Sequence, residues 1–147
     1  QRIILGGSEK SAHAVQDELH ETVKEKIIDI VAVPIDTDDR TLMERIIPTA
    51  LDFEREQERI LVEDLIGMAK SNGRAVLGQD EIEDALTQQR VELLVAPWMA
   101  QSNIQDTVKH LVTHTIQNGG NIEFVHGKAA DILKDEGGVA ARLYYTI

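Results

Sequence analysis

Short apolar runs alternate with helix-like segments along this chain, and this alternation limits the folds that it can adopt. In the second half, each run except the last is followed by a helical pattern or a helix-start signal. Such alternation is typical of a parallel or mixed sheet with helices on both faces. We therefore expect an α/β fold, with a three-layer α/β/α sandwich of mixed sheet over residues 73–147. The expected strands are 75–77, 91–96, 122–125 and 139–147, and the expected helices are 80–89, 102–117 (opened by a capping box at Ser102 and Gln105) and 128–134.

Residues 1–72 show a partial version of the same pattern. Residues 3–5 read as a strand, and Ser8 is placed to cap a helix that we expect to continue to about Lys24. Residues 27–33 form an almost continuous apolar run, which is typical of a strand covered on both faces. We therefore expect this half to be a partial α/β unit that ends in a helix leading to the second half.

The expected connecting helix contains an unusual polar stretch. Thr41 and Glu44 form a capping box, and Pro48 predicts a kink or break before a long helix that ends at a stop signal, residues 71–73. Residues 54–59 are polar all round, which is typical of a helix that bridges two packed bodies. Pairs of opposite charge at i,i+3, each worth roughly 0.2–0.5 kcal/mol, are Asp52–Arg55 and Glu56–Arg59.

The charge of the chain argues against one class of function. The formal net charge is −11 at pH 7, from 26 acidic and 15 basic residues among 147. Both halves are acidic: residues 1–73 hold 16 acidic and 9 basic residues, and residues 74–147 hold 10 and 6. Proteins that bind DNA or RNA usually carry a basic surface, so autonomous nucleic-acid binding is not expected.

The sequence lacks cysteine, a membrane-spanning segment and a signal-peptide pattern, and each absence argues against a kind of site or a location. The chain has no cysteine, which excludes a disulfide framework, a Cys-ligated zinc site and a thiol nucleophile. No apolar run approaches the roughly 18 residues of a membrane helix, and no signal-peptide pattern is seen. We expect a cytoplasmic protein without a membrane partner. Because Gln1 is not an initiator methionine and residues 2–5 are strand-like without a leader, we expect a piece of a longer protein.

Two loops that follow strands could bind a ligand. The first places glycines at a strand–helix junction, where many α/β folds bind phosphate, but it lacks P-loop and GxGxxG spacing, and a tight turn with a serine cap is the simpler interpretation. The second gathers carboxylates that suit Mg²⁺, Ca²⁺ or acid–base chemistry, although such loops before a helix are commonly just solvated. If both lay at one sheet edge, the chain could be a small α/β enzyme or a nucleotide or metal binder. The loops are Gly6, Gly7, Ser8, Glu9 and Lys10, and Asp36, Thr37, Asp38 and Asp39.

Histidines, serines and one tryptophan give weaker signals. His110 and His114 have a zinc-chelating spacing, but without the glutamate of HExxH two solvent-facing histidines are the simpler interpretation. No GxSxG motif is present. Trp98 follows a strand and could anchor a partner or cover the edge of the sheet. From these patterns no catalytic, cofactor-binding or metal-ligating residue is assigned, and no cofactor is expected.

The second half also carries apolar and glycine-containing segments in a fixed order, closing on Gly137-Gly138-Val139-Ala140-Ala141 and a tyrosine pair. Their order and spacing resemble the C-terminal domain of the archaeal and eukaryotic class-1 translation release factors and of Pelota. Residues 1–73, which begin with a strand and the Gly6-Gly7 turn, resemble the later part of the family's middle domain and the helix that follows it. The segments of the second half are 75–78, 82–86, 91–95, 119–124, 127, 132–133 and 137–145.

This resemblance implies a role in translation. The family's release factors carry a hydrolytic Gly-Gly-Gln loop in the middle domain, whereas the glycine pairs of this chain are followed by Ser8, Asn121 and Val139. No catalytic residue is therefore carried over, and the chain is not expected to be an enzyme. The family's last domain docks a translational GTPase, which implies a translational GTPase or a ribosomal protein as the partner. We expect a non-catalytic docking part of a release or ribosome-rescue factor.

Two further implications come from the same resemblance. The zinc-bearing insertion of some archaeal members is missing, which, with the acidic composition, fits a bacterial member of the family. The family's last domain is also similar in fold to kink-turn-binding ribosomal proteins, which leaves an RNA-binding module as an alternative that the charge disfavours.

Overall fold

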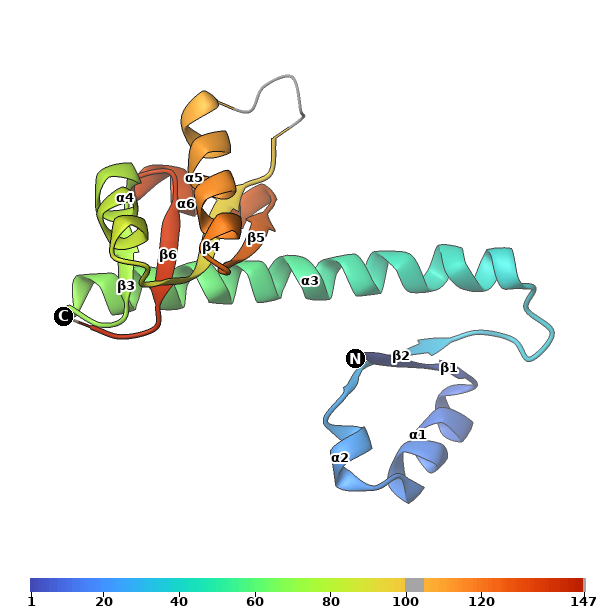
Figure 1. The fold of residues 1–147 in the computed structure, drawn as a ribbon. Helices are drawn as coiled ribbons and strands as arrows, with labels where there is room; N and C mark the ends of the chain where they lie inside the picture. Colours follow the sequence, from blue (N-terminus) through green and yellow to red (C-terminus); the bar gives the residue numbers. More distant parts are fainter. Residues whose placement is uncertain (100–104, 147) are drawn as a thin grey trace. The chain divides into compact units, whose positions relative to one another are not determined.

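The structure, a computed structural model, describes residues 1–99 and 105–146 (Figure 1). Contacts divide the chain into two compact units, Gln1–Glu54 (unit 1) and Arg55–Ile147 (unit 2). The division lies inside one helix, α3 (Asp39–Lys70), which therefore contributes to both units. Among the described residues, no helix combines the length and the apolar character that crossing a membrane requires.

Unit 1 contains a two-stranded parallel sheet with helices between and after its strands. The expected helix cap is confirmed, because Ser8 Oγ accepts a hydrogen bond from the Ser11 N–H at 3.2 Å. The expected burial of the second strand on both faces is wrong: its residues are half-buried or exposed, as follows from a sheet of only two strands. The elements before α3 are β1 (Ile3–Gly7), α1 (Glu9–Glu18), α2 (Glu21–Lys24) and β2 (Ile27–Ala32).

The helix expected to reach Lys24 is interrupted. Leu19 adopts an extended conformation (φ −78°, ψ 149°), and α1 ends before it. His20 then caps the short helix α2, because its Nδ1 accepts a hydrogen bond from the Thr22 N–H at 3.3 Å. A local side-chain bond to the backbone thus replaces the continuation of the first helix.

Helix α3 also begins and continues differently from the expectation. It starts at Asp39, capped by Asp38, whose Oδ1 accepts from the Thr41 N–H at 2.9 Å; the expected capping box of Thr41 and Glu44 is wrong. The helix passes through Pro48 without a break. Proline removes one backbone hydrogen bond and crowds the carbonyl of the preceding turn, but the neighbouring leucine, methionine, arginine and alanine residues are good helix formers.

Unit 2 is built on a four-stranded mixed sheet with the strand order β3-β6-β4-β5. β4 and β5 are parallel, and β6 runs antiparallel to both β3 and β4. The last expected strand is shorter than predicted, since β6 ends at Leu143. The elements are β3 (Ala75–Leu77), α4 (Gln79–Thr87), β4 (Val91–Pro97), α5 (Asp106–Gln117), β5 (Asn121–Val125), α6 (Gly127–Asp135) and β6 (Ala140–Leu143). The capping box expected at Ser102 lies outside the described residues.

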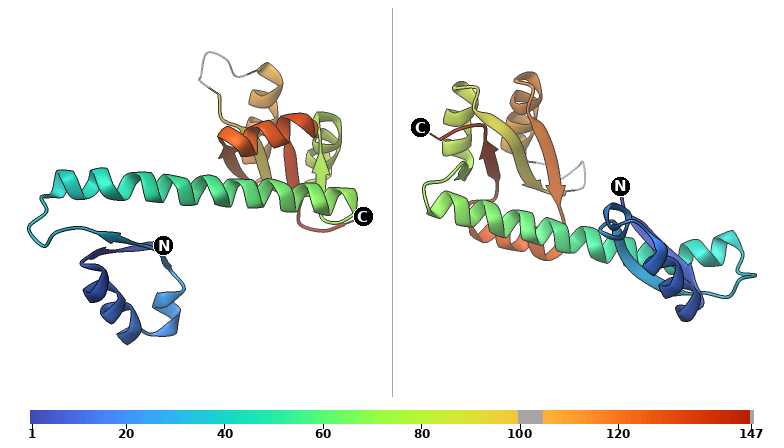
Figure 2. Two further views of the ribbon diagram at one scale, coloured as in Figure 1. Left: turned by 180° about the vertical axis from the view of Figure 1, so that it is seen from behind. Right: turned by 90° about the horizontal axis from the view of Figure 1, so that it is seen from below.

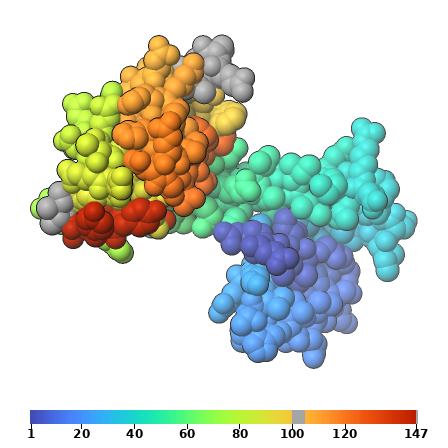
Figure 3. Space-filling view, in the orientation of Figure 1, coloured from blue at the N-terminus to red at the C-terminus, as the bar shows by residue number. Residues whose placement is uncertain are grey.

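Two apolar cores hold this sheet between two helical layers (Figure 2). On one face, α4 and α5 lie side by side (Figure 3) and pack Leu86 and Leu111 against Leu94. On the other face, α6 and the second half of α3 pack Leu133 and Leu65 against the sheet. The expected three-layer α/β/α sandwich with a mixed sheet is therefore confirmed, and α3 is one of its layers.

The place of α3 bears on where the domains divide. The expected division after residue 72 assigns the whole helix to the first half, whereas the contacts divide the chain after Glu54. The reason is that Val62, Leu65 and Ile66 on α3 are buried in unit 2. The numbered domains 1–72 and 73–147 stay a prediction.

Candidate functional site

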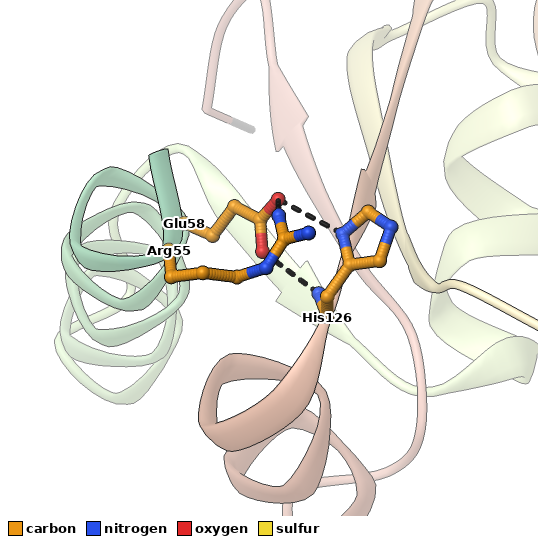
Figure 4. A network of polar contacts seen from close by, with 3 residues as sticks. All are labelled: Arg55, Glu58 and His126. Atoms are coloured by element: carbon orange, nitrogen blue, oxygen red, sulfur yellow. Dashed lines mark hydrogen bonds and ion pairs between the residues drawn. The ribbon is translucent and has the colours of Figure 1, made fainter. Parts of the chain in front are cut away.

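A buried carboxylate marks the start of α3 in unit 2. Glu58 is 7 % exposed, although it lies in the stretch that reads as polar all round. Its Oε2 accepts from the His126 backbone N–H at 2.8 Å, and its Oε1 lies 2.9 Å from Arg55 Nη1 and 3.0 Å from His126 Nδ1 (Figure 4). Because an ionised carboxylate only accepts, the last contact places a ring proton on Nδ1. Arg55, Glu58 and His126 form what we call the Glu58 cluster.

His126 reaches Glu58 because of its place between two elements. It follows the end of β5 and is the N-cap residue of α6. The Glu58 carboxylate therefore lies near the positive end of the α6 dipole, where negative charge is favoured. The three donors leave the buried carboxylate fully paired, as burial of a charge requires.

Trp98 extends the cluster to the surface. The Trp98 backbone N–H donates to the Val125 carbonyl at 2.7 Å, which continues the β4–β5 pairing beyond Pro97. Its ring stacks on that of His126, with centroids 5.6 Å apart and planes at 25°, and meets the Phe124 ring edge-on at 5.7 Å. The side chain thus covers the end of the sheet and is still 58 % exposed. The expected role as edge cover agrees with this position, and the role as a partner anchor stays a prediction.

The chemistry open to the Glu58 cluster is limited. A carboxylate that orients a histidine is found in hydrolytic triads, but such a triad also needs a nucleophile within reach of the histidine. Within the described part of the chain, the side-chain hydrogen bonds and ring contacts of Glu58 and His126 involve Arg55, Trp98 and each other, and none of them involves a hydroxyl group. What the Glu58 cluster does in the fold is to join α3 to the junction between β5 and α6.

The two candidate ligand loops of unit 1 do lie at the same end of the parallel sheet. A hollow of about 710 Å³ is lined by Gly6, Gly7 and Ser8 from the first loop and by residues 33–35 and Thr37 around the second. Its remaining lining is largely apolar, and neither Lys10 nor any of the loop's aspartates lines it. Asp38 instead caps α3, and its two bonds to the backbone and side chain of Thr41 lower its pKa.

The histidine pair of α5 lies on the surface beside α4. The His110 and His114 ring centroids are 5.8 Å apart, and His110 Nε2 is 3.5 Å from Glu83 Oε1. Among the residues with a described position, no group of three or more histidine, aspartate or glutamate side chains has the arrangement of a metal site. The pair therefore carries a weak polar contact between two helices.

Arg90 is a second buried charge, and no motif in the sequence marks it. It is 6 % exposed at the start of β4, and its Nη2 donates to the Tyr145 carbonyl at 3.0 Å. Its Nη1 lies 3.3 Å from Gln88 Oε1, and its Nε has no hydrogen-bond partner within the described residues. Arg90 thus holds the segment after β6 against the sheet, together with the bond from the Tyr144 N–H to its carbonyl.

Comparison with known proteins adds a likeness in fold. No protein-family model and no curated protein sequence matches the chain. The Pelota structure from Archaeoglobus fulgidus superposes with a TM-score of 0.65 at 18% identity and covers 99% of this chain and 49% of its own. Dom34 of S. cerevisiae gives 0.70 at 15% identity, covering 99% and 47%. The archaeal translation termination factor aRF1 gives 0.52 at 19% identity, covering 98% and 43%.

These matches extend over both units. The chain spans less than half the length of each of these structures. At such identities the likeness concerns the fold, and at that level it confirms the resemblance to Pelota and the class-1 release factors expected from the sequence. The chain has the fold that Pelota, Dom34 and archaeal aRF1 share over this part of their length.

Proposed function

We propose that this chain is part of a translation termination or ribosome-rescue factor, and that its unit 2 docks a protein partner on or near the ribosome. The observation that supports this most is the match of nearly the whole chain to Dom34, a termination-like factor that interacts with Hbs1. A structure of ribosome-bound archaeal Pelota with ABCE1 matches the whole chain with a TM-score of 0.68. A translational GTPase or a ribosomal protein is the partner that this likeness favours.

Charge supports a protein partner over RNA. The net charge of −11 is spread over both halves of the sequence, so the chain as a whole repels a phosphate backbone. A protein surface with basic residues would be attracted to the same charge. We propose that this chain contacts protein and that it does not itself contact RNA.

We also propose that the chain itself is not catalytic. Its glycine pairs are not followed by glutamine, and the Glu58 cluster lacks a nucleophile among its described contacts. The alternative of a nucleotide- or metal-binding enzyme requires ligand groups in the hollow of unit 1. The apolar lining and the use of Asp38 as a helix cap give that alternative less support.

Sedimentation with ribosomes tests the proposal. The chain should pellet with ribosomes in the presence of the soluble protein fraction. With ribosomes washed in high salt it should pellet less if its partner is a translational GTPase, which the wash removes, and equally well if its partner is a ribosomal protein, which the wash leaves in place. It should not hydrolyse peptidyl-tRNA. Naked ribosomal RNA serves as the control for the RNA-binding alternative.

Three results would contradict the proposal. Absence from the ribosomal pellet under growth, stationary phase and stress would remove the translational role. Salt-sensitive binding to naked RNA would instead support the RNA-binding alternative. A higher melting temperature with ATP or Mg²⁺ would favour the enzyme alternative.

A further inference from the structure

The attachment of α3 to unit 2 begins with a polar contact. The buried residues of α3 are Glu58, Val62, Leu65 and Ile66, and Glu58 is the first of them along the chain. The other three are held by apolar packing against the sheet and α6. Glu58 is held by its bonds to His126 and Arg55, so the first turn of the attachment depends on hydrogen bonds made by specific donors.

The attachment of this first turn therefore holds only while the donors of Glu58 stay in place. Leaving a buried carboxylate without its donors is strongly destabilising, whereas apolar burial is non-directional and needs no specific partner atom. Two of the three donors belong to His126. The position of His126 therefore decides whether Glu58 stays buried.

His126 is also held from a second side, by Trp98. The stacked rings place Trp98 over the same imidazole whose Nδ1 contacts Glu58. The Trp98 side chain is more than half exposed, so it is open to contact from outside the unit. The His126 ring thus lies between the exposed Trp98 side chain and the buried Glu58 carboxylate of α3.

We propose that Trp98, His126 and Glu58 act as a coupling device: displacement of Trp98 moves His126, weakens its bonds to Glu58 and releases the first turn of α3 in unit 2. The released turn remains helical, because Arg59 pairs with Glu56 at 2.5 Å and with Glu63 at 2.6 Å within the helix itself. Contact at Trp98 thereby changes how firmly unit 2 holds α3, the helix that leads out of it. This effect does not depend on which partner the chain has.

Coupling between two sites is reciprocal, and this makes the device testable without a partner. Trp98 is the lone tryptophan, so its fluorescence reports one end, and the amide of His126, which bonds to Glu58, reports the other by hydrogen exchange. Glu58→Gln should increase acrylamide quenching of Trp98. Trp98→Ala should accelerate exchange of the His126 amide by about tenfold, and adding Glu58→Gln should accelerate it little further.

Two controls separate coupling from general loosening. Asp64→Asn changes an exposed carboxylate further along the same helix and should leave both signals unchanged. The amides of Leu94 and Val95 in the core should exchange as in the wild type in every variant. Should Glu58→Gln fail to fold, Glu58→Asp, with its shorter side chain, takes its place.

The proposal fails if only one end responds to change at the other, since coupling must act in both directions. It also fails if the effects of Trp98→Ala and Glu58→Gln on the His126 amide simply multiply. Equal acceleration of the His126 and Leu94 amides would mean global destabilisation and would overturn it as well.

Discussion

Thr115 and Gly120 lie so close together that position 120 has no room for a side chain. A Cβ on Gly120 would lie 2.7 Å from Thr115 Cγ2 and 2.9 Å from the Val91 carbonyl oxygen. The Gly120 N–H donates to the Thr115 carbonyl at 2.9 Å, and the fully buried Thr115 donates its Oγ1 proton to the Leu111 carbonyl at 2.7 Å. The turn from α5 to β5 is thus packed against the first residue of β4.

Gly120→Ala should therefore destabilise unit 2 by about 1–3 kcal/mol, the usual cost of forcing an extra group into a packed interior. Urea unfolding followed by Trp98 fluorescence measures the change. Thr115→Ser in the same background removes the clashing methyl group but leaves the carbonyl contact, so it should restore only part of the loss. An unchanged urea midpoint for Gly120→Ala would contradict this packing.

Gly67 provides the matched control in the same unit. It lies inside α3, and a Cβ there would meet nothing within 4 Å. Gly67→Ala should stabilise the chain by about 0.5–1 kcal/mol, because alanine has the better helix propensity and loses less backbone freedom on folding.

The strands of unit 2 are the part of the fold that local sequence predicts best. Residues 75–77, 91–96 and 122–125 are short apolar runs between turn signals, and each is a strand in the structure. Of the three, β4 is buried in the centre of the sandwich and is apolar along most of its length, so its burial is visible in sequence. β3 and β5 lie at the edges of the sheet, and their apolar residues and flanking turn signals are what identify them. The helix ends are less visible: after the break at Leu19, α2 is capped by the His20 ring, which accepts a hydrogen bond from the Thr22 N–H, and no sequence pattern announces this cap.

The polar stretch of α3 shows that local sequence predicts side-chain pairing only in part. The expected Glu56–Arg59 pair is confirmed, but Arg55 pairs with Glu58 in place of Asp52. One local signal was present, because Glu58 shares a helix face with Val62 and Leu65. Its partner His126 lies 68 residues away, and no local pattern relates the two. Pairing of this kind needs the tertiary structure.

Acid should weaken the start of α3 in unit 1. The bonds from the Thr41 N–H and hydroxyl hold the pKa of Asp38 below its ordinary value. Because the folded-state pKa is the lower one, ionised Asp38 contributes stability above the unfolded-state pKa, and this contribution is lost as pH falls through the folded-state pKa. Amide exchange of residues 41–44 in wild type and Asp38→Asn should therefore differ most near neutral pH and converge in acid.

Asp36 offers a control for that measurement, since within the described part of the chain its carboxylate makes no hydrogen bond comparable to those of Asp38. Asp36→Asn should exchange like the wild type at every pH. A difference between wild type and Asp38→Asn that stays constant from neutral pH into acid would show that the Asp38 charge does not take part in capping α3.

Two truncated chains decide where the second domain begins. Residues 55–147 keep the half of α3 that buries Val62 and Leu65, whereas residues 73–147 expose the sheet face formed by Leu93 and Val95. Burial of one such side chain contributes about 1.5–3 kcal/mol, against a total stability of about 5–15 kcal/mol for a typical domain. The shorter chain should therefore be less stable by at least about 3 kcal/mol in urea, or unfolded by circular dichroism, while the longer chain folds cooperatively. Equal stability of the two would place the boundary after residue 72 and reduce α3 to a connector.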